Sequence, residues 1–117
     1  QDGGRSWDSA MVVASEGGDS LNDPTVVVEQ RTGRILIHYT RFAQGFHTDK
    51  AVPGYTSPHA SRNLVKVSGD HGVSWSTPLD ITAPVKRPEV RCAVVTCGLG
   101  IQVRRGSRAG RLVHAVY

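Results

Sequence analysis

Apolar residues in this chain come in short runs of three to five, such as residues 10–14, 26–28 and 35–37. Each run is soon followed by Gly, Pro, Asn, Asp or Ser, and the spacing typical of an amphipathic helix is absent almost throughout. No run approaches the roughly 20 apolar residues that a membrane-spanning helix needs. The pattern therefore predicts an all-β fold with many turns and no membrane segment.

Eight segments carry a strand signal. Glycines in residues 31–34 and 107–110 supply the positive φ that a tight hairpin turn needs between neighbouring strands. Residues 41–62 form the longest region without a strand signal, and a loop of this length in a compact fold is usually functional or mobile. The predicted strands are residues 10–14, 25–29, 34–39, 63–67, 79–82, 91–96, 100–104 and 112–117.

Two predicted strands carry consecutive apolar residues, at 26–28 and 35–37, where a strand with one wet face would alternate. Consecutive apolar residues indicate a strand that is covered on both faces. The blades of a β-propeller give their strands this environment, because each blade lies between its neighbours.

The net charge is +4, from 14 Lys and Arg against 10 Asp and Glu. This balance raises the question of nucleic-acid binding. Four arginines gather around the predicted turn at 107–110, but no aromatic residues lie among them to stack on bases. We therefore expect no nucleic-acid partner, and an anionic small ligand would use the charge equally well. The four are Arg104, Arg105, Arg108 and Arg111.

Cys92 and Cys97 lie five positions apart on one predicted strand, so their side chains should face opposite sides. A disulfide between them would need a sharp distortion, and two cysteines without a matching pair of histidines do not make a zinc site. We expect buried free thiols, no metal and no cofactor. The histidines show no ligand spacing and are expected at surface or turn positions. They are His38, His47, His59, His71 and His114.

A short motif occurs twice: residues 2–7 read DGGRSW, and residues 70–75 read DHGVSW. The aspartate can accept several backbone N–H bonds across a tight turn, and the glycine supplies a geometry that other residues resist. The tryptophan would fill the gap at the sheet edge, its indole N–H free to donate to a carbonyl. We interpret the motif as structural. Its members are Asp2, Gly4, Trp7, Ser68, Asp70, Gly72 and Trp75.

The motif resembles the Asp box of sialidases (neuraminidases) and of other proteins with the same propeller repeat. Further segments look like sialidase sequence, in collinear order over nearly the whole chain. They are residues 22–28 with 32–39, the tripeptide QGF at 44–46, and residues 98–103 with 108–113, which are similar to the family's Gly-x-Gly-Ile-Gln-Leu and Gly-Arg-Leu-Val.

The resemblance implies a six-bladed β-propeller built from antiparallel four-stranded sheets with Asp-box turns. A blade of four short strands takes roughly 40 to 50 residues. Residues 1–117 would then hold about two blades of a partial sialidase propeller domain, with Asp boxes at 2–7 and 68–75.

The resemblance also implies an activity. Exo-α-sialidases are retaining glycoside hydrolases that release terminal sialic acids from glycoproteins, gangliosides and oligosaccharides. They hold the sialic acid carboxylate with three arginines and use a Tyr–Glu pair as nucleophile and an Asp as acid and base, an exception to the usual two carboxylates.

By similarity, these groups lie before residue 1 or after the segment at 110–113, so we expect no main catalytic residue in the chain. The polar start at residues 1–5, without an initiating Met or an apolar signal segment, favours a beginning inside a longer product. We expect the chain to be inactive alone. The resemblance favours a secreted or cell-envelope parent.

Four residues match family positions near the sialic acid. Asp23 matches an acidic residue at the pocket rim, although an Asx-type turn before proline explains it equally well. Phe46 matches an aromatic residue beside the N-acetyl group, which needs an apolar surface, although a loop phenylalanine also anchors its own loop. Gln102 and Tyr117 lie on predicted strands whose inner ends face the central channel in the family.

A function of another class stays open. A non-catalytic Asp-box propeller that binds glycans or protein partners would show the same motifs. An arginine in a Phe-Arg-Ile-Pro-like segment before residue 1, followed by a second arginine and an aspartate, would favour the enzyme. Within the chain, Arg41 would suit a carboxylate, but the resemblance places the carboxylate clamp elsewhere.

Overall fold

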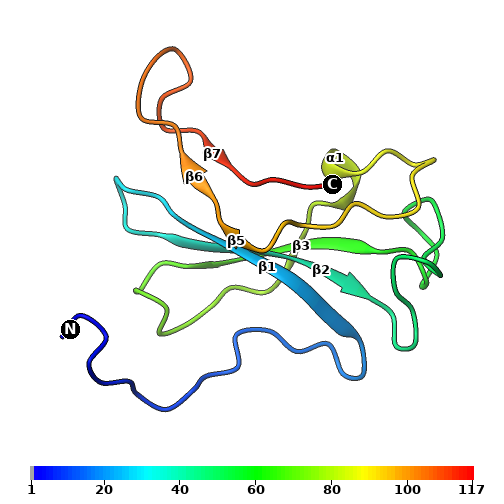
Figure 1. Ribbon diagram of the computed structural model, residues 1–117, viewed down its shortest axis with the longest axis horizontal. Helices are drawn as coiled ribbons and strands as arrows, with labels where there is room; N and C mark the ends of the chain where they lie inside the picture. The colour runs from blue at the N-terminus through cyan, green and yellow to red at the C-terminus, as the bar shows by residue number, and fades with distance from the viewer. Residues whose placement is uncertain (1) are drawn as a thin grey trace.

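The computed structural model describes residues 2–117, and their regular structure is almost entirely β, as the sequence predicts (Figure 1). Helix α1 is a single turn, and no helix in the described chain is long and apolar enough to cross a membrane. The elements are β1 (Ser20–Val28), β2 (Ile35–Phe42), β3 (Arg62–Ser68), β4 (Leu79–Asp80), α1 (Thr82–Val85), β5 (Gly98–Leu99), β6 (Ile101–Gln102) and β7 (Leu112–Val113).

One sheet dominates the molecule, with the strand order β4-β3-β2-β1-β5. Strands β1 to β4 form an antiparallel meander, and the short β5 joins its edge parallel to β1, pairing Thr25 with Gly98. Strands β6 and β7 form a separate antiparallel pair, which stands off the main sheet in Figure 1. The predicted four-stranded antiparallel sheet is therefore present, with a fifth strand that the sequence pattern does not indicate.

The two predicted glycine turns both close hairpins. Gly33, with φ 73°, lies in the turn between β1 and β2, where the N–H of Glu29 donates to the carbonyl of Arg34 at 2.8 Å. Gly110, with φ 88°, lies between β6 and β7. Each turn works because glycine reaches positive φ without the steric cost of a Cβ.

The predicted strands at residues 10–14 and 79–82 differ from the structure. Residues 10–14 form no strand, because an apolar run becomes one only when a partner lies alongside it. The carbonyl of Val13 instead accepts a hydrogen bond from Nζ of Lys66 at 2.6 Å. The predicted strand at 79–82 shortens to β4, because the chain turns at Asp80, which accepts the N–H of Thr82 at 2.8 Å, and helix α1 follows from Thr82.

The predicted strand at 91–96 is also wrong, because this segment crosses over the sheet rather than pairing along it. Its only ladder contact is an isolated bridge between Val95 and Val116. The N–H of Val95 donates to Oγ1 of Thr40 at 3.0 Å, and Asn63 Nδ2 donates to the carbonyl of Ala93 at 3.0 Å. The segment therefore lies against the last part of β2 and the beginning of β3.

Burial on both faces occurs in β2, but later than the apolar run predicts. His38, Tyr39 and Thr40 are buried in succession, whereas residues 35–37 are half-buried and Val28 is exposed. Buried His38 contradicts the expected surface or turn position. Its Nε2 lies 3.0 Å from Oδ1 of Asn63, a partner that offsets the cost of burying the ring.

Both copies of the repeated motif form turns around their aspartate. Asp2 accepts the N–H groups of Gly4 and Arg5 at 3.1 and 2.9 Å, and Asp70 accepts the N–H of Ser74 at 2.9 Å. Gly4 has φ 83°, a value that favours glycine.

The two tryptophans differ. Nε1 of Trp75 donates to the carbonyl of Gly72, which has φ 90°, at 3.2 Å, and the ring is half-buried. Trp7 is 88% exposed, contrary to the predicted role at a sheet edge, because no sheet of the described chain lies beside it.

Candidate functional site

Asp23 lies at an irregularity near the start of β1. The pairing with β2 shifts register between Asn22 and Thr25, and Asp23 takes φ 54°, which is uncommon for a residue with a side chain. The following Pro24 has no N–H to continue the ladder. The local sequence thus turns the Asp23 carboxylate out of the regular strand.

The partner of this carboxylate is Cys97. Its thiol donates a hydrogen bond to Oδ1 of Asp23 at 2.9 Å. This hydrogen bond, followed by desolvation and the negative charge of Asp23, raises the pKa of the Cys97 thiol above its usual range. Cys97 and Cys92 are both free. Cys92 is half-buried and Cys97 is exposed, contrary to the predicted burial, because Cys97 lies at a bend directly before β5 and not within a strand.

In the loop of residues 43–61, the side chain of Phe46 packs against a second ring, that of His59. The rings of Phe46 and His59 are stacked, with centroids 4.0 Å apart and planes 18° from parallel. This stack thus joins the beginning of the loop to its end. The phenylalanine side chain is half-buried, and His59 is exposed.

An ion pair fixes the beginning of this loop. Asp19 accepts hydrogen bonds from Nε of Arg41 at 2.6 Å and from the N–H of Gln44 at 2.9 Å. The guanidinium of Arg41 also forms an ion pair with Asp19, and these contacts hold the pKa of Asp19 below its usual value. Arg41 therefore helps to anchor the beginning of the loop through Asp19.

The far part of the loop is tied to the chain around α1. The hydroxyl of Tyr55 donates to the carbonyl of Lys86 at 2.6 Å, and the N–H of Gly54 donates to the carbonyl of Pro88 at 2.7 Å. Ala51 packs in the buried core with Phe42 and Val94. This long loop is thus packed against the rest of the chain.

Strand pairing places Asp23 and the Phe46 loop at one end of the sheet, because Ser20 at the start of β1 pairs with Phe42 at the end of β2. Gln102 lies at the other end, where its Oε1 accepts the N–H of Gln30 at 2.8 Å. Six strand positions separate residue 23 from residue 29, a distance of about 20 Å. The structure does not bring Gln102 together with Asp23.

The fourth predicted residue, Tyr117, is 77% exposed, and its backbone pairs with that of Val94 through bonds of 2.8 and 2.9 Å. Within residues 2–117, no three His, Cys, Asp or Glu side chains are grouped to hold a metal ion.

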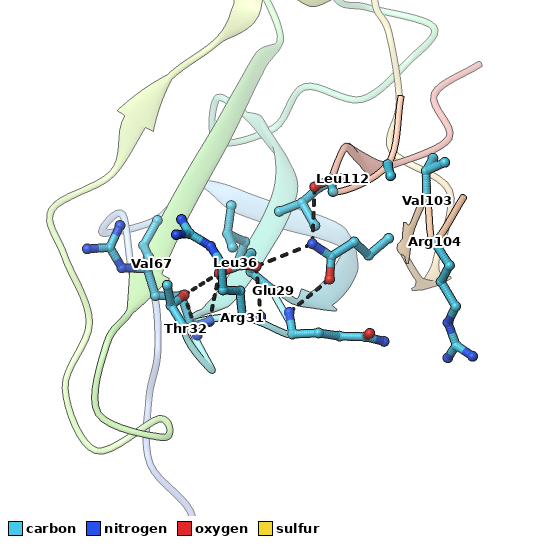
Figure 2. Close-up of a pocket in the computed structure, with 13 residues that line it drawn as sticks. Glu29, Arg31, Thr32, Leu36, Val67, Val103, Arg104 and Leu112 are labelled. Atoms are coloured by element: carbon cyan, nitrogen blue, oxygen red, sulfur yellow. Dashed lines mark hydrogen bonds between the residues drawn. The ribbon is translucent and has the colours of Figure 1, made fainter. Parts of the chain in front are cut away.

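An open groove of about 970 Å³ surrounds Gln102, between the β1–β2 turn and the β6–β7 hairpin (Figure 2). Nε2 of Gln102 bridges the two, donating to Oε1 of Glu29 at 3.3 Å and to the carbonyl of Gly110 at 3.1 Å. Hydrogen bonds, first from the hydroxyl of Thr32 and then from the N–H of Arg31, lower the pKa of Glu29 to about 2. Glu29 is therefore ionised and organises its own turn.

Known proteins are similar to this chain in sequence and in fold. No protein-family model matches the sequence. A sialidase of Micromonospora viridifaciens is 33% identical over 118 residues, which cover 96% of this chain and 18% of that protein. A sialidase of Bacteroides fragilis (strain YCH46) is 25% identical over 91% of this chain and 22% of that protein. The chain resembles sialidases over nearly its whole length.

The solved structure of the Hadza microbial sialidase Hz136 matches this fold with a TM-score of 0.79 and 26% identity. The match covers 88% of this chain and 22% of that one. This chain thus spans about a fifth of the length of each of these sialidases.

Sequence reasoning on the sialidase resemblance missed three residues at the Asp23 end of the sheet: Cys97, His59 and Asp19. Cys97 reaches Asp23 across 74 positions, and no local pattern signals such a contact. His59 lies within the long loop, where a search for a ring partner of Phe46 would have found it, whereas Asp19 precedes β1 and lies 22 positions from Arg41.

Proposed function

We propose that this chain is part of an exo-α-sialidase, a retaining glycoside hydrolase that releases terminal sialic acids from glycoconjugates. The observation that carries the proposal is the 33% identity with the Micromonospora viridifaciens sialidase over 96% of the chain. The shared fold supports it. Because the chain covers about a fifth of these relatives, the activity is proposed for the full polypeptide that carries it.

We infer that the fold is about two blades of a six-bladed propeller, with the repeated motif as its Asp-box turns. The meander β1 to β4 supplies one four-stranded blade, and the β6–β7 hairpin belongs to the next. The hydrogen bonds that Asp2 and Asp70 accept across their turns support this interpretation.

In this proposal the Asp23 end of the sheet contributes to the sialic acid pocket. Asp23 is turned out of its strand by the bulge, as a residue at a pocket rim must be. Phe46 offers a ring face for the methyl of the N-acetyl group, and His59 fixes the plane of that ring from behind. The roles of Gln102 and Tyr117 in substrate binding stay predictions.

The chemical step belongs to groups outside this chain in the proposal. The contribution of residues 2–117 is binding: a carboxylate at the rim, an apolar surface, and a loop fixed by Asp19 and Tyr55. Interactions of this kind orient a substrate before reaction. This orientation increases the reaction rate as well as the binding affinity.

The full polypeptide, incubated with a fluorogenic α-sialoside, tests the proposal. We expect release of sialic acid, with the α-anomer appearing first in proton NMR because the reaction is retaining. The 117-residue chain alone should release none. Binding of sialylated glycans by the full polypeptide without hydrolysis would contradict the enzyme and favour the non-catalytic propeller.

A further inference from the structure

Two histidines from distant parts of the chain stack on each other inside the molecule. His38 lies in the middle of β2, and His114 directly follows β7. Their ring centroids are 5.5 Å apart, with planes 25° from parallel. His38 is 3% exposed and His114 is half-buried. Residues of this chain bury His38, so the pair does not depend on an open face of the sheet.

The stack belongs to the contact between the sheet and the C-terminal segment, residues 112–117. Val94 and Thr96 of the crossing segment donate their N–H groups to carbonyls of this segment at 2.8 and 3.0 Å. The ring of His114 fills the space beside Gly100, where a Cβ would lie 2.5 Å from its Cδ2. Through this ring the C-terminal segment reaches the middle of β2.

A hydrogen bond fixes which nitrogen of His38 carries the hydrogen. Nδ2 of Asn63 donates to the carbonyl of Ala93 at 3.0 Å, and its Oδ1 lies 3.0 Å from Nε2 of His38. Because an amide oxygen only accepts, Nε2 must donate. The neutral ring is therefore satisfied in this tautomer. A further proton would go to Nδ1 and place a full charge on a buried ring, which is costly without an opposite charge.

The described chain places no opposite charge at the two rings. The residues paired with His38 are Thr25 on β1 and Val65 on β3, and neither ionises. Residues 93–96 of the crossing segment and strands β5, β6 and β7 also contain no ionisable residue. Tyr39 follows His38 and points to the opposite face of β2.

The charged groups elsewhere on β1, β2 and β3 have partners of their own. These are Asp23 with the thiol of Cys97, Arg41 with Asp19, Arg62 with Asp80, and Lys66 with the carbonyl of Val13.

The pKa values of both rings reflect this environment. Burial lowers the pKa of His38, its hydrogen bond to Asn63 raises it, and a charge on His114 lowers it. Burial lowers the pKa of His114 as well. Both rings therefore resist protonation as long as they stay packed in the fold.

We propose that the His38–His114 pair is an acid-sensitive switch, which holds residues 112–117 on the sheet at neutral pH and releases them when the rings gain protons. Two stacked cations repel each other, and release brings water to both. The contact contributes fully above about pH 6.5, the ordinary pKa of histidine, and weakens as the pH falls below it. This device is independent of sialoside hydrolysis.

Hydrogen–deuterium exchange of the full polypeptide at pH 7.5 and pH 5.0 is the test, read by mass spectrometry of peptides covering residues 93–102 and 112–117. The rates are corrected for the intrinsic effect of pH on amide exchange. We expect the protection of these peptides to fall about tenfold or more at pH 5.0, since a pKa difference of one unit between the closed and open states is worth a factor of about ten. Peptides from β2 and β3 should lose less protection, because the meander stays folded.

Two substitutions remove the titration and keep the packing. His38→Gln retains an N–H that can donate to Asn63, and His114→Phe retains a ring stacked on His38. Each should reduce the ratio of protection between the two pH values, and the double variant should hold it below about threefold. Because each variant is compared with itself at two pH values, a general loss of stability does not affect the result. The single variants test the proposal separately if the double variant does not fold.

His71→Asn is the matched control, an exposed histidine with φ 60°, a value that asparagine tolerates. It should keep the wild-type ratio. Equal protection of the wild type at both pH values would overturn the proposal, as would a wild-type ratio in both His38→Gln and His114→Phe. A ratio reduced equally by His71→Asn would place the acid effect elsewhere and also overturn it.

Discussion

The thiol of Cys97 donates a hydrogen bond to Oδ1 of Asp23 at 2.9 Å, joining the edge of β5 to the irregular start of β1. A thiol that donates to a carboxylate is held in its protonated form, and the thiolate is the reactive species. The contact therefore protects an exposed cysteine and gives the Asp23 carboxylate a fixed direction.

Asp23→Asn should speed alkylation of Cys97 at pH 7 to 8 severalfold, because removing the negative charge lowers the pKa of the thiol toward its usual value. Iodoacetamide labelling with peptide mass spectrometry measures the rate, and Cys92 in the same molecule is the internal control. An unchanged Cys97 rate would mean that the thiol–carboxylate bond does not persist in solution.

Phe46→Ala should raise the KM of the proposed sialidase about fivefold to tenfold with little change in kcat. In the proposed contact the ring would bury about 50 Å² of the N-acetyl methyl group, worth on the order of 1 kcal/mol at about 25 cal/mol/Å². Steady-state kinetics with N-acetylated and de-N-acetylated sialosides separates the effects. Selective loss on the acetylated substrate supports the contact, whereas equal loss on both would reduce Phe46 to a loop anchor.

His59→Ala is a sharper companion, since His59 stacks behind Phe46 and no substrate contact is proposed for it. We expect the same selectivity for the acetylated substrate with a smaller rise in KM, because the Phe46 ring loses its fixed plane. His71→Ala is the control, an exposed histidine in the turn of the second repeat. If His59→Ala affects both substrates equally, the stack serves the loop alone.

Asp70→Ala should lower the melting temperature of the full polypeptide, because Asp70 holds its turn through Ser68 and Ser74. Hydrogen bonds, first from the Ser74 hydroxyl and then from its N–H, lower the pKa of Asp70 from 3.8 to about 2. A depressed carboxyl pKa stabilises the folded state above about pH 4, and this contribution is lost as the pH falls through about 2.

The difference in melting temperature between wild type and Asp70→Ala should therefore shrink between pH 4 and pH 2 in calorimetric scans. Asp49→Ala, at an exposed carboxylate elsewhere, is the matched control. The pH profile of activity should not change with either substitution. A loss of activity without a lower melting temperature would contradict the structural role of the motif.

Gly100→Ala should destabilise the fold by about 1 to 3 kcal/mol, a typical cost of overpacking. A Cβ at this position would lie 2.5 Å from Cδ2 of His114 and 3.0 Å from Cβ of Val27. The His114 ring has little freedom to move away, because it stacks on His38 with centroids 5.5 Å apart. Gly69→Ala meets nothing within 4 Å and should be nearly neutral in the same thermal melts. Equal melting temperatures for the two variants would show that the β5–β6 segment packs more loosely.

Features that depend on neighbouring residues were predictable from the sequence. The Gly33 and Gly110 hairpins, the long loop and the turn around Asp70 follow from local φ requirements and local hydrogen bonds. Features that depend on distant segments were not. The parallel β5, the crossing at Val95 and the burial of His38 arise because residues 91–100 return to the meander, and apolar runs do not encode which strand they meet.

The candidate site divides in the same way. Asp23 is a candidate because it precedes Pro24 and matches a family position, but its partner Cys97 lies 74 positions away. The position of Gln102 also depends on distant segments. Strand order places it with Glu29 at the opposite end of β1, a separation that only the register of the sheet reveals.

The return of residues 93–98 across β1, β2 and β3 has a consequence for the order of folding. Contacts within the meander close much shorter loops, the longest being residues 43–61, whereas pairing Thr25 with Gly98 closes a loop of more than seventy residues. Long loops cost more entropy and form later. The meander should therefore assemble first during synthesis, and Asp23 should gain its thiol partner only after the ribosome has released the segment that contains Cys97.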